Sequence, residues 1–182
     1  MFTYALDEET LLKLLAPEHV APLFKLTNES RKTLRKWLPW VDAVTDIKHT
    51  ESFVKGAMNQ TAQNGGFTAG IWYRGDLAGI IGLHQIDWRN RTVSIGYWLG
   101  HRFEGKGLMT SACRALVDHA LVDMNLNRVE IRCATHNEKS RAIPERLHFI
   151  LEGVIREAEK LPDGYVDHVV YGMLQREWNL IR

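Results

Sequence analysis

Hydrophobic and polar positions repeat along this chain with two different periods. Alternation or short apolar runs, the pattern of strands, occupy 11–15, 67–73, 77–86, 92–99, 127–135, 149–161 and 165–174. Helical spacing, or a run between helix start and stop signals, occupies 17–27, 28–38, 47–64, 107–124 and 137–147. The order predicts an α/β fold, β-αα-ββ-β-α-β-α-ββ, with a mixed sheet and helices on both faces.

Start and stop residues support these helix boundaries. Pro17 suits a first helical turn, and either Thr45 or Asp46 can cap the long helix that ends before Gly65. Because no repeat, low-complexity segment or Pro/Ser-rich linker divides the chain, we expect residues 1–182 to form a single domain.

Composition narrows the class of protein. Hydrophobic residues make up 45% of the chain and charged residues 25%, as in ordinary globular proteins. The formal net charge of +1 gives no reason to expect a nucleic-acid or membrane partner. The densest basic cluster, at 31–36, is interpreted as a solvated helix face.

The cysteines and the N-terminus bear on the cellular setting. Cys113 and Cys133 have no metal-ligand or CxxC spacing, so the sequence predicts buried free thiols and no metal site. Neither a signal peptide nor an apolar run of the ~18 residues that a membrane span needs is visible. We therefore expect a soluble protein of the reducing cytoplasm.

The segment "GYWLGHRFEGKGLMTSA", residues 96–112, joins a predicted strand to a predicted helix through a glycine-rich loop. The first amides of a helix lack internal partners and lie at the positive end of its dipole, so the loop suits a pyrophosphate. Arg102 and Lys106 add positive charge. The loop is no P-loop and no dinucleotide fingerprint, which would need Gly where Thr110 stands. A tight turn without a ligand is the alternative.

The arrangement of motifs resembles the GNAT family of N-acetyltransferases. The R-x-x-G-x-G run from Arg102 to Gly107 is similar to the acetyl-CoA loop of that family, and "LAGIIGLHQID", "IGYWL", "NRVEIRCATHNEKS" and "LHFILEG" surround it in the family's order. With "LRKWLPWVD" near the N-terminus, the chain resembles the branch that acetylates the N-terminal amines of ribosomal proteins. The likeness covers residues 11–174 and implies a GNAT fold, with acetyl-CoA as cosubstrate.

The resemblance also implies which residues bind the cofactor: Tyr97, Trp98, Leu99, Arg102, Gly105, Lys106, Gly107 and Asn137. The loop members would hold the pyrophosphate of CoA through backbone amides, and the strand members would meet its pantetheine arm. A β-bulge at 96–99 would splay two neighbouring strands and open a slot for the thioester.

Catalytic roles for Ser140 and Glu159 follow from the same resemblance. Ser140 would hydrogen-bond the departing thiolate. Glu159 would act through water as the base toward the amine, since a free amine is mostly protonated near neutral pH. A helix cap is the alternative role for Ser140 and for Asn137, and an exposed strand carboxylate is the alternative for Glu159.

Two residues depart from the family pattern. His148 stands where the family has a glycine, at a place that suits a positive φ, and Pro144 falls inside the predicted helix. Either departure would shift Ser140 relative to the thioester.

The resemblance favours the N-terminal amine of a protein or peptide, such as a ribosomal protein, as the acceptor. Acetylation of a small amine (a polyamine, an amino acid or an aminoglycoside) and a non-catalytic acyl-CoA-binding role stay open, as does a homo-oligomer. The loop at 37–47 and the turn at 162–164 are expected to shape the choice of acceptor.

Overall fold

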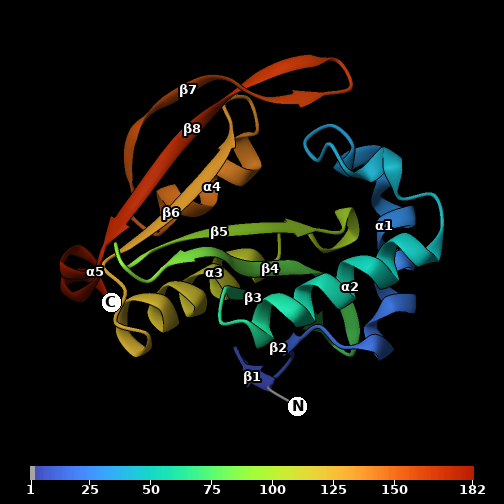
Figure 1. Ribbon diagram of the computed structural model, residues 1–182, viewed down its shortest axis with the longest axis horizontal. Helices are drawn as coiled ribbons and strands as arrows, with labels where there is room; N and C mark the ends of the chain where they lie inside the picture. The colour runs from blue at the N-terminus through green and yellow to red at the C-terminus, as the bar shows by residue number, and fades with distance from the viewer. Residues whose placement is uncertain (1–2) are drawn as a thin grey trace.

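The computed structural model describes residues 3–182, which build an eight-stranded mixed sheet (Figure 1). The strands are β1 (Thr3–Ala5), β2 (Thr10–Leu14), β3 (Gly66–Tyr73), β4 (Asp76–Asp87), β5 (Thr92–Leu99), β6 (Arg128–Ala134), β7 (Ile150–Leu161) and β8 (Gly164–Leu174). Their order in the sheet is β1-β2-β3-β4-β5-β6-β8-β7. All neighbours are antiparallel except β5 and β6, which run parallel.

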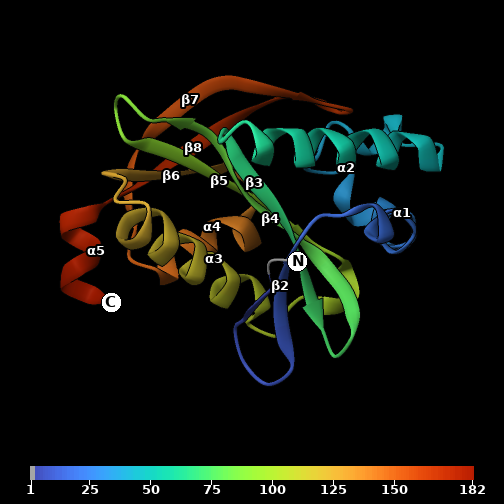
Figure 2. The ribbon, with the colours of Figure 1, turned by 60° about the horizontal axis from the view of Figure 1, so that its bottom comes forward.

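Helices cover both faces of the sheet, as predicted (Figure 2). They are α1 (Val20–Leu34), α2 (Ile47–Ala62), α3 (Leu108–Asp118), α4 (Glu138–Arg146) and α5 (Gln175–Ile181). α1 and α2 pack on β3 and β4 and define what we call the α1/α2 face. α3 packs on β4 and β5, and α4 on β6, and these two define the α3/α4 face.

Alternation along β5 divides its side chains between the two faces. The hydroxyl of Tyr97 reaches the backbone of α4, while the ring of Trp98 lies 5.9 Å from that of Trp40, in the segment between α1 and α2. On the α3/α4 side, Val93 and Ile95 are buried in the core. Tyr97 therefore faces the α3/α4 side of the sheet, and Trp98 faces the α1/α2 side.

The structure corrects several expected boundaries. The helices predicted at 17–27 and 28–38 are one helix, α1, after a short 3-10 turn at Pro17–His19. Ser30 continues the buried stripe of Leu23, Leu26 and Leu34 through the polar segment, so the helix does not break there. β1 and α5 were not predicted, because each is too short to show a period.

Asp46 is confirmed as the cap of α2, because its carboxylate accepts the amide N–H of Lys48 at 2.9 Å. The helix ends earlier than Gly65, at Ala62, and the turn that follows places Asn64 at a φ of 57°. Within residues 3–182, every helix is too short or too polar to pass through a lipid bilayer.

Candidate active site

β5 and β6 pair only over their first residues and then diverge. Their ladder runs from Thr92 opposite Arg128 to Ser94 opposite Glu130, and it ends there. From Ile95 to Leu99, β5 stays paired with β4 but has no partner on the β6 side. The expected splay is therefore present, with a free strand edge facing the gap.

The expected position of the β-bulge is wrong. β5 has no irregularity at 96–99; the register shifts instead in β4, between His84 and Asp87, where Gln85 has a φ of 55°. A bulge adds twist to the strand that contains it. The bulge in β4 lies opposite residues 92–94 of β5, the same residues that pair with β6.

The loop from Gly100 to Gly107 is anchored to α1. A side chain on Gly100 would collide with Leu26, so only glycine lets the loop pack this closely. The amide N–H of His101 donates to the hydroxyl of Ser30 at 3.2 Å. These contacts hold the beginning of the loop and leave its end to lead into α3.

Gly105 and Gly107 give the end of the loop its shape. Their φ values are 75° and 76°, in the left-handed region that favours glycine, and a Cβ on either would meet only open space. Gly107 is the N-cap of α3, and in the part of the chain that the structure describes no side chain caps that helix. The first amides of α3 are thus free to donate to an anion, which the helix dipole also favours.

The two basic residues of the loop are exposed and differ in their partners. The guanidinium of Arg102 lies 3.6 Å from the carboxylate of Asp76 and 4.6 Å from the ring of Phe103. Lys106 makes no ion pair in the described part of the chain. An anion bound at the start of α3 would find the positive charges of Arg102 and Lys106 in the loop that precedes the helix.

Pro144 lies inside α4, as the sequence predicted, and it changes the hydrogen bonding of one backbone carbonyl. Proline has no N–H, so the carbonyl of Ser140, four residues earlier, lacks its usual helical donor. The hydroxyl of Tyr97 donates to that carbonyl at 2.9 Å. A residue of the free edge of β5 is thereby fastened to the backbone of Ser140.

The surroundings of this hydrogen bond are apolar. Burial raises the pKa of Tyr97 well above its usual value, so its hydroxyl stays a donor. Burial also raises the pKa of Cys133 to about 11, and a hydrogen bond from the side chain of Ser140 opposes this only in part. The thiol is therefore neutral near pH 7, and Ser140 lies beside it at the gap between β5 and β6.

Asn137 caps α4, because its side-chain oxygen accepts the amide N–H of Ser140 at 3.3 Å. His148, beyond the end of the same helix, has a φ of 61°, the conformation that the sequence predicted for it. The ends of α4 thus have the expected geometry, with Ser140 in its first turn.

Glu159 lies on the side of the sheet opposite Cys133. The register of β7 shifts between Ile155 and Glu159, and this bulge sets Glu159 opposite Val166, on the same face of the hairpin as His168. Nε2 of His168 lies 3.2 Å from a carboxylate oxygen of Glu159. His168 pairs with Ala134 of β6, which follows Cys133. Because neighbouring residues of a strand face opposite sides of the sheet, His168 and Glu159 lie on the side opposite the buried Cys133.

The basic cluster at 31–36 is not simply a solvated face. Arg31 donates to the carbonyl of Val44 at 2.6 Å, and Arg35 binds both carboxylate oxygens of Asp42 at 3.0 and 2.8 Å. These bonds fold the segment between α1 and α2 and fix Trp40 near β5. No pattern within the cluster predicted them, because the partners lie outside it.

Two further contacts were missed by sequence reasoning. The pairing of Glu159 with His168 depends on the bulge in β7, which no turn residue announces. The bond from Tyr97 to Ser140 had a detectable signal, since a proline inside a predicted helix always leaves one carbonyl without its donor.

This combination of a diverging pair of strands and a glycine loop opening into an uncapped helix matches a known family. Residues 10–150 match the family model for the acetyltransferase (GNAT) domain, and the chain belongs to that family. It is thus an acetyl-CoA-dependent N-acetyltransferase, and the open space at Gly105 and Gly107 fits that cosubstrate.

Among relatives, YdaF of Bacillus subtilis, to which ribosomal N-acetyltransferase activity is ascribed, is 39% identical over 98% of both chains. The ribosomal-protein-serine acetyltransferase of Escherichia coli is 31% identical over 94% of this chain and 96% of its own. A solved structure of RimL, a ribosomal α-N-protein acetyltransferase, has a TM-score of 0.92, with 28% identity over 95% of this chain and 98% of that one. That structure contains coenzyme A bonded to a cysteine by a disulfide.

Proposed function

We propose that this enzyme transfers the acetyl group of acetyl-CoA to the N-terminal α-amine of a protein, with a ribosomal protein as the acceptor. YdaF and the ribosomal-protein-serine acetyltransferase of Escherichia coli align over nearly the whole chain, including the segments on the α1/α2 face. The observation that carries the proposal is the free edge of β5. The backbone of Ser140 is bonded to Tyr97 of this edge, and Glu159 belongs to the β7–β8 hairpin, on the opposite face of the sheet.

The cofactor residues divide into two groups in this proposal. The amides of Gly105, Lys106, Gly107 and the first turn of α3 bind the pyrophosphate, with Arg102 and Lys106 supplying charge. The backbone of Tyr97, Trp98 and Leu99 offers the donors and acceptors that have no partner on the β6 side to the pantetheine amides. Asn137 acts indirectly, by capping the helix that carries Ser140.

Acetyl-CoA supplies an activated thioester, and the protein supplies position and proton transfer. Glu159 accepts a proton from the acceptor amine, through a water molecule, so that the nitrogen can attack. The hydroxyl of Ser140 donates a hydrogen bond to the sulfur as the carbon–sulfur bond breaks and the carbon–nitrogen bond forms. The proton lost by the amine finally balances the thiolate as a thiol.

His168 tunes this chemistry through its contact with Glu159. An N–H donated from Nε2 over 3.2 Å holds the carboxylate of Glu159 in one orientation. In this proposal, the bulge of β7 and the contact with His168 orient Glu159 toward the acceptor amine. We therefore assign His168 a positioning role.

The test is acetylation of peptides that carry the N-terminal sequences of ribosomal proteins, followed by thiol release from acetyl-CoA and by mass spectrometry of the product. We expect one acetyl group on the α-amine. A matched peptide with a blocked N-terminus and one internal lysine is the control and should not react. Acetylation of small amines alone would refute the peptide assignment.

The proposal extends to the location and assembly of the enzyme. The two buried free thiols, Cys113 and Cys133, suit the reducing cytoplasm, where acetyl-CoA and ribosomal proteins also meet. The homo-oligomer stays a prediction, testable by light scattering of the purified enzyme.

A further inference from the structure

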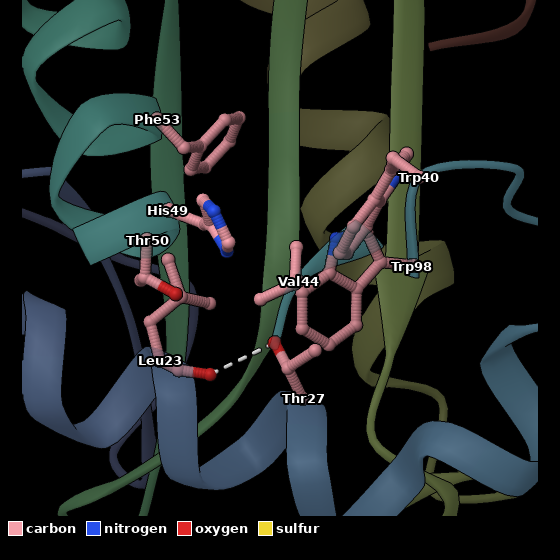
Figure 3. Close-up of a pocket in the computed structure, with 8 residues that line it drawn as sticks. All are labelled: Leu23, Thr27, Trp40, Val44, His49, Thr50, Phe53 and Trp98. Carbon is pink, nitrogen blue, oxygen red and sulfur yellow. Dashed lines mark hydrogen bonds between the residues drawn. The ribbon is translucent and has the colours of Figure 1, made fainter. Parts of the chain in front are cut away.

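A cavity of about 330 Å³ opens on the α1/α2 face (Figure 3). Its lining residues are Leu23, Thr27, Trp40, Val44, His49, Thr50, Phe53 and Trp98. They come from α1, the segment after it, α2 and β5. Trp98 belongs to the free edge of β5, so the cavity adjoins the strand along which the acetyl donor is proposed to lie.

Among residues 3–182, the lining contains no carboxylate and no ammonium or guanidinium group. Two indoles, Phe53 and two aliphatic side chains supply most of its surface. Of the hydroxyls, that of Thr27 is already used, since it donates to the carbonyl of Leu23 at 2.9 Å. A cationic chain would lose its hydration here without gaining a counter-charge, whereas an apolar group would be stabilised.

The ring of His49 is fixed by hydrogen bonds on one side only. Its Nδ1 accepts the amide N–H groups of Thr45 and Asp46, each at 3.3 Å, in the cap of α2. A ring nitrogen that accepts carries no proton, so the proton of the neutral ring is on Nε2. His49 therefore keeps the N–H of Nε2 for the cavity that it lines, beside Phe53 in Figure 3.

The rim of the cavity is held in place and is also partly exposed. The bonds of Arg31 and Arg35 fold the segment that carries Trp40, and the ring of Trp40 lies 5.9 Å from that of Trp98. Yet the exposed fractions of Trp40 and Phe53 are 38% and 47%. Large aromatic side chains left open at a fixed cavity are typical of a ligand site.

We propose that this cavity, named here the acceptor pocket, binds an uncharged apolar side chain within the first three residues of the acceptor polypeptide. The inference rests on the proposed function and adds to it a preference for acceptors with an apolar side chain near the N-terminus. Trp98 is four positions beyond Ser94, where the strands part, a span of about 13 Å along a strand. An extended peptide whose amine lies within that span brings one of its first residues to the pocket. The Nε2–H of His49 can then bond a backbone carbonyl of the peptide.

The experiment measures kcat/KM for peptides that are identical except at one of the first three positions, where alanine, leucine or lysine is placed. Leucine should exceed alanine by about tenfold or more at one position, and lysine should fall below alanine there. Spermidine, as a cationic probe, should be a poor acceptor. Equal rates for alanine, leucine and lysine at all three positions would overturn the inference.

Variants separate the pocket from general damage. Phe53→Ala should remove most of the leucine preference, and Phe53→Glu should reverse it in favour of lysine by adding a carboxylate at the exposed rim. Leu180→Ala, which removes an apolar side chain that is 86% exposed on α5, is the matched control and should keep the wild-type preference. A gain for lysine cannot come from misfolding, so an unchanged order of rates in Phe53→Glu would count against the pocket.

Calorimetric binding of CoA gives an independent readout. All three variants should bind CoA as the wild type does, because the lining of the pocket includes no residue of the glycine loop. If the wild type acetylates no peptide but acetylates small amines, the proposed function itself fails. If it acetylates peptides without regard to the side chain, only the acceptor pocket fails.

Discussion

The two faces of the sheet offer a ligand different kinds of surface. On the α3/α4 face, the glycine loop presents backbone: two residues with φ near 75° and a helix without a side-chain cap. On the α1/α2 face, the acceptor pocket presents side chains from α1, α2, β5 and the segment between the helices. Backbone contacts tolerate many sequences, whereas a pocket of side chains changes with each substitution. A cosubstrate common to a family suits the first surface, and a particular acceptor suits the second.

The largest effect is expected on the backbone side. Gly107→Glu should weaken CoA binding by more than about 100-fold, or ~2.7 kcal/mol, because it places a carboxylate where the helix dipole and amides would hold a phosphate. Calorimetric titration with CoA measures this. Gly75→Glu is the matched control: Gly75 has a φ of 86° and open space at its Cβ, so it suffers similar strain. Equal losses in both variants would show that strain, and not the ligand, is responsible.

The next effect separates chemistry from cofactor binding. Glu159→Gln should lower kcat by about 100-fold while leaving the affinity for acetyl-CoA unchanged. The loss should shrink above about pH 8, where an α-amine with an ordinary pKa of about 7.7–8.0 is already neutral. Glu157→Gln, an exposed carboxylate in the same bulge, is the control. A wild-type pH–rate profile in the Glu159 variant would remove the base role.

A smaller effect tests the bond that joins β5 to α4. Tyr97→Phe leaves the carbonyl of Ser140 without a donor and should lower the free energy of unfolding by about 1–3 kcal/mol. In a Pro144→Ala background the loss should be smaller, since the restored N–H can bond that carbonyl within the helix. Urea denaturation of the two single variants and the double variant gives the coupling. Strict additivity would mean that proline does not control this bond.

The smallest effect concerns the end of α4. His148→Gly should raise the free energy of unfolding by at most about 1 kcal/mol, because glycine adopts a φ of 61° without strain. The greater entropy of glycine in the unfolded chain opposes this gain and keeps it small. Ala142→Gly, inside the same helix, should instead lower it by about 1 kcal/mol. Thermal or urea denaturation distinguishes the two. A loss at both positions would show that the left-handed conformation of His148 carries no strain.

Local signals in the sequence identified most of the strands and the cofactor loop. Asp46 was identifiable as a cap because capping involves residues only two or three apart. The positive φ expected at His148 is likewise a property of one helix end. Errors arose where one element depended on another. α1 was divided between residues 27 and 28, and the buried Ser30 that continues its stripe has its partner, His101 in the loop before α3, 71 residues away.

The catalytic candidates show the same limit. Ser140 and Glu159 were named from a family resemblance, but their partners were not. Tyr97 was expected to line the cofactor slot, and its hydrogen bond to Ser140 crosses from β5 to α4. The bulge that places Glu159 beside His168 leaves no recognisable turn residue in β7. The bulge expected in β5 lies in β4 for the same reason: an irregular register belongs to a pair of strands, not to one.

By itself, the sequence determined most of the strands and helices, the glycine loop, the caps of α2 and α4, and the family. Each of these depends on the spacing of residues within one element or one turn, where few conformations are sterically allowed. Only the tertiary structure decided where β5 and β6 part, which donor meets Ser140, and which side chains line the acceptor pocket. Those features arise from contacts between segments that are distant along the chain, and their geometry is set by packing, which no local period encodes.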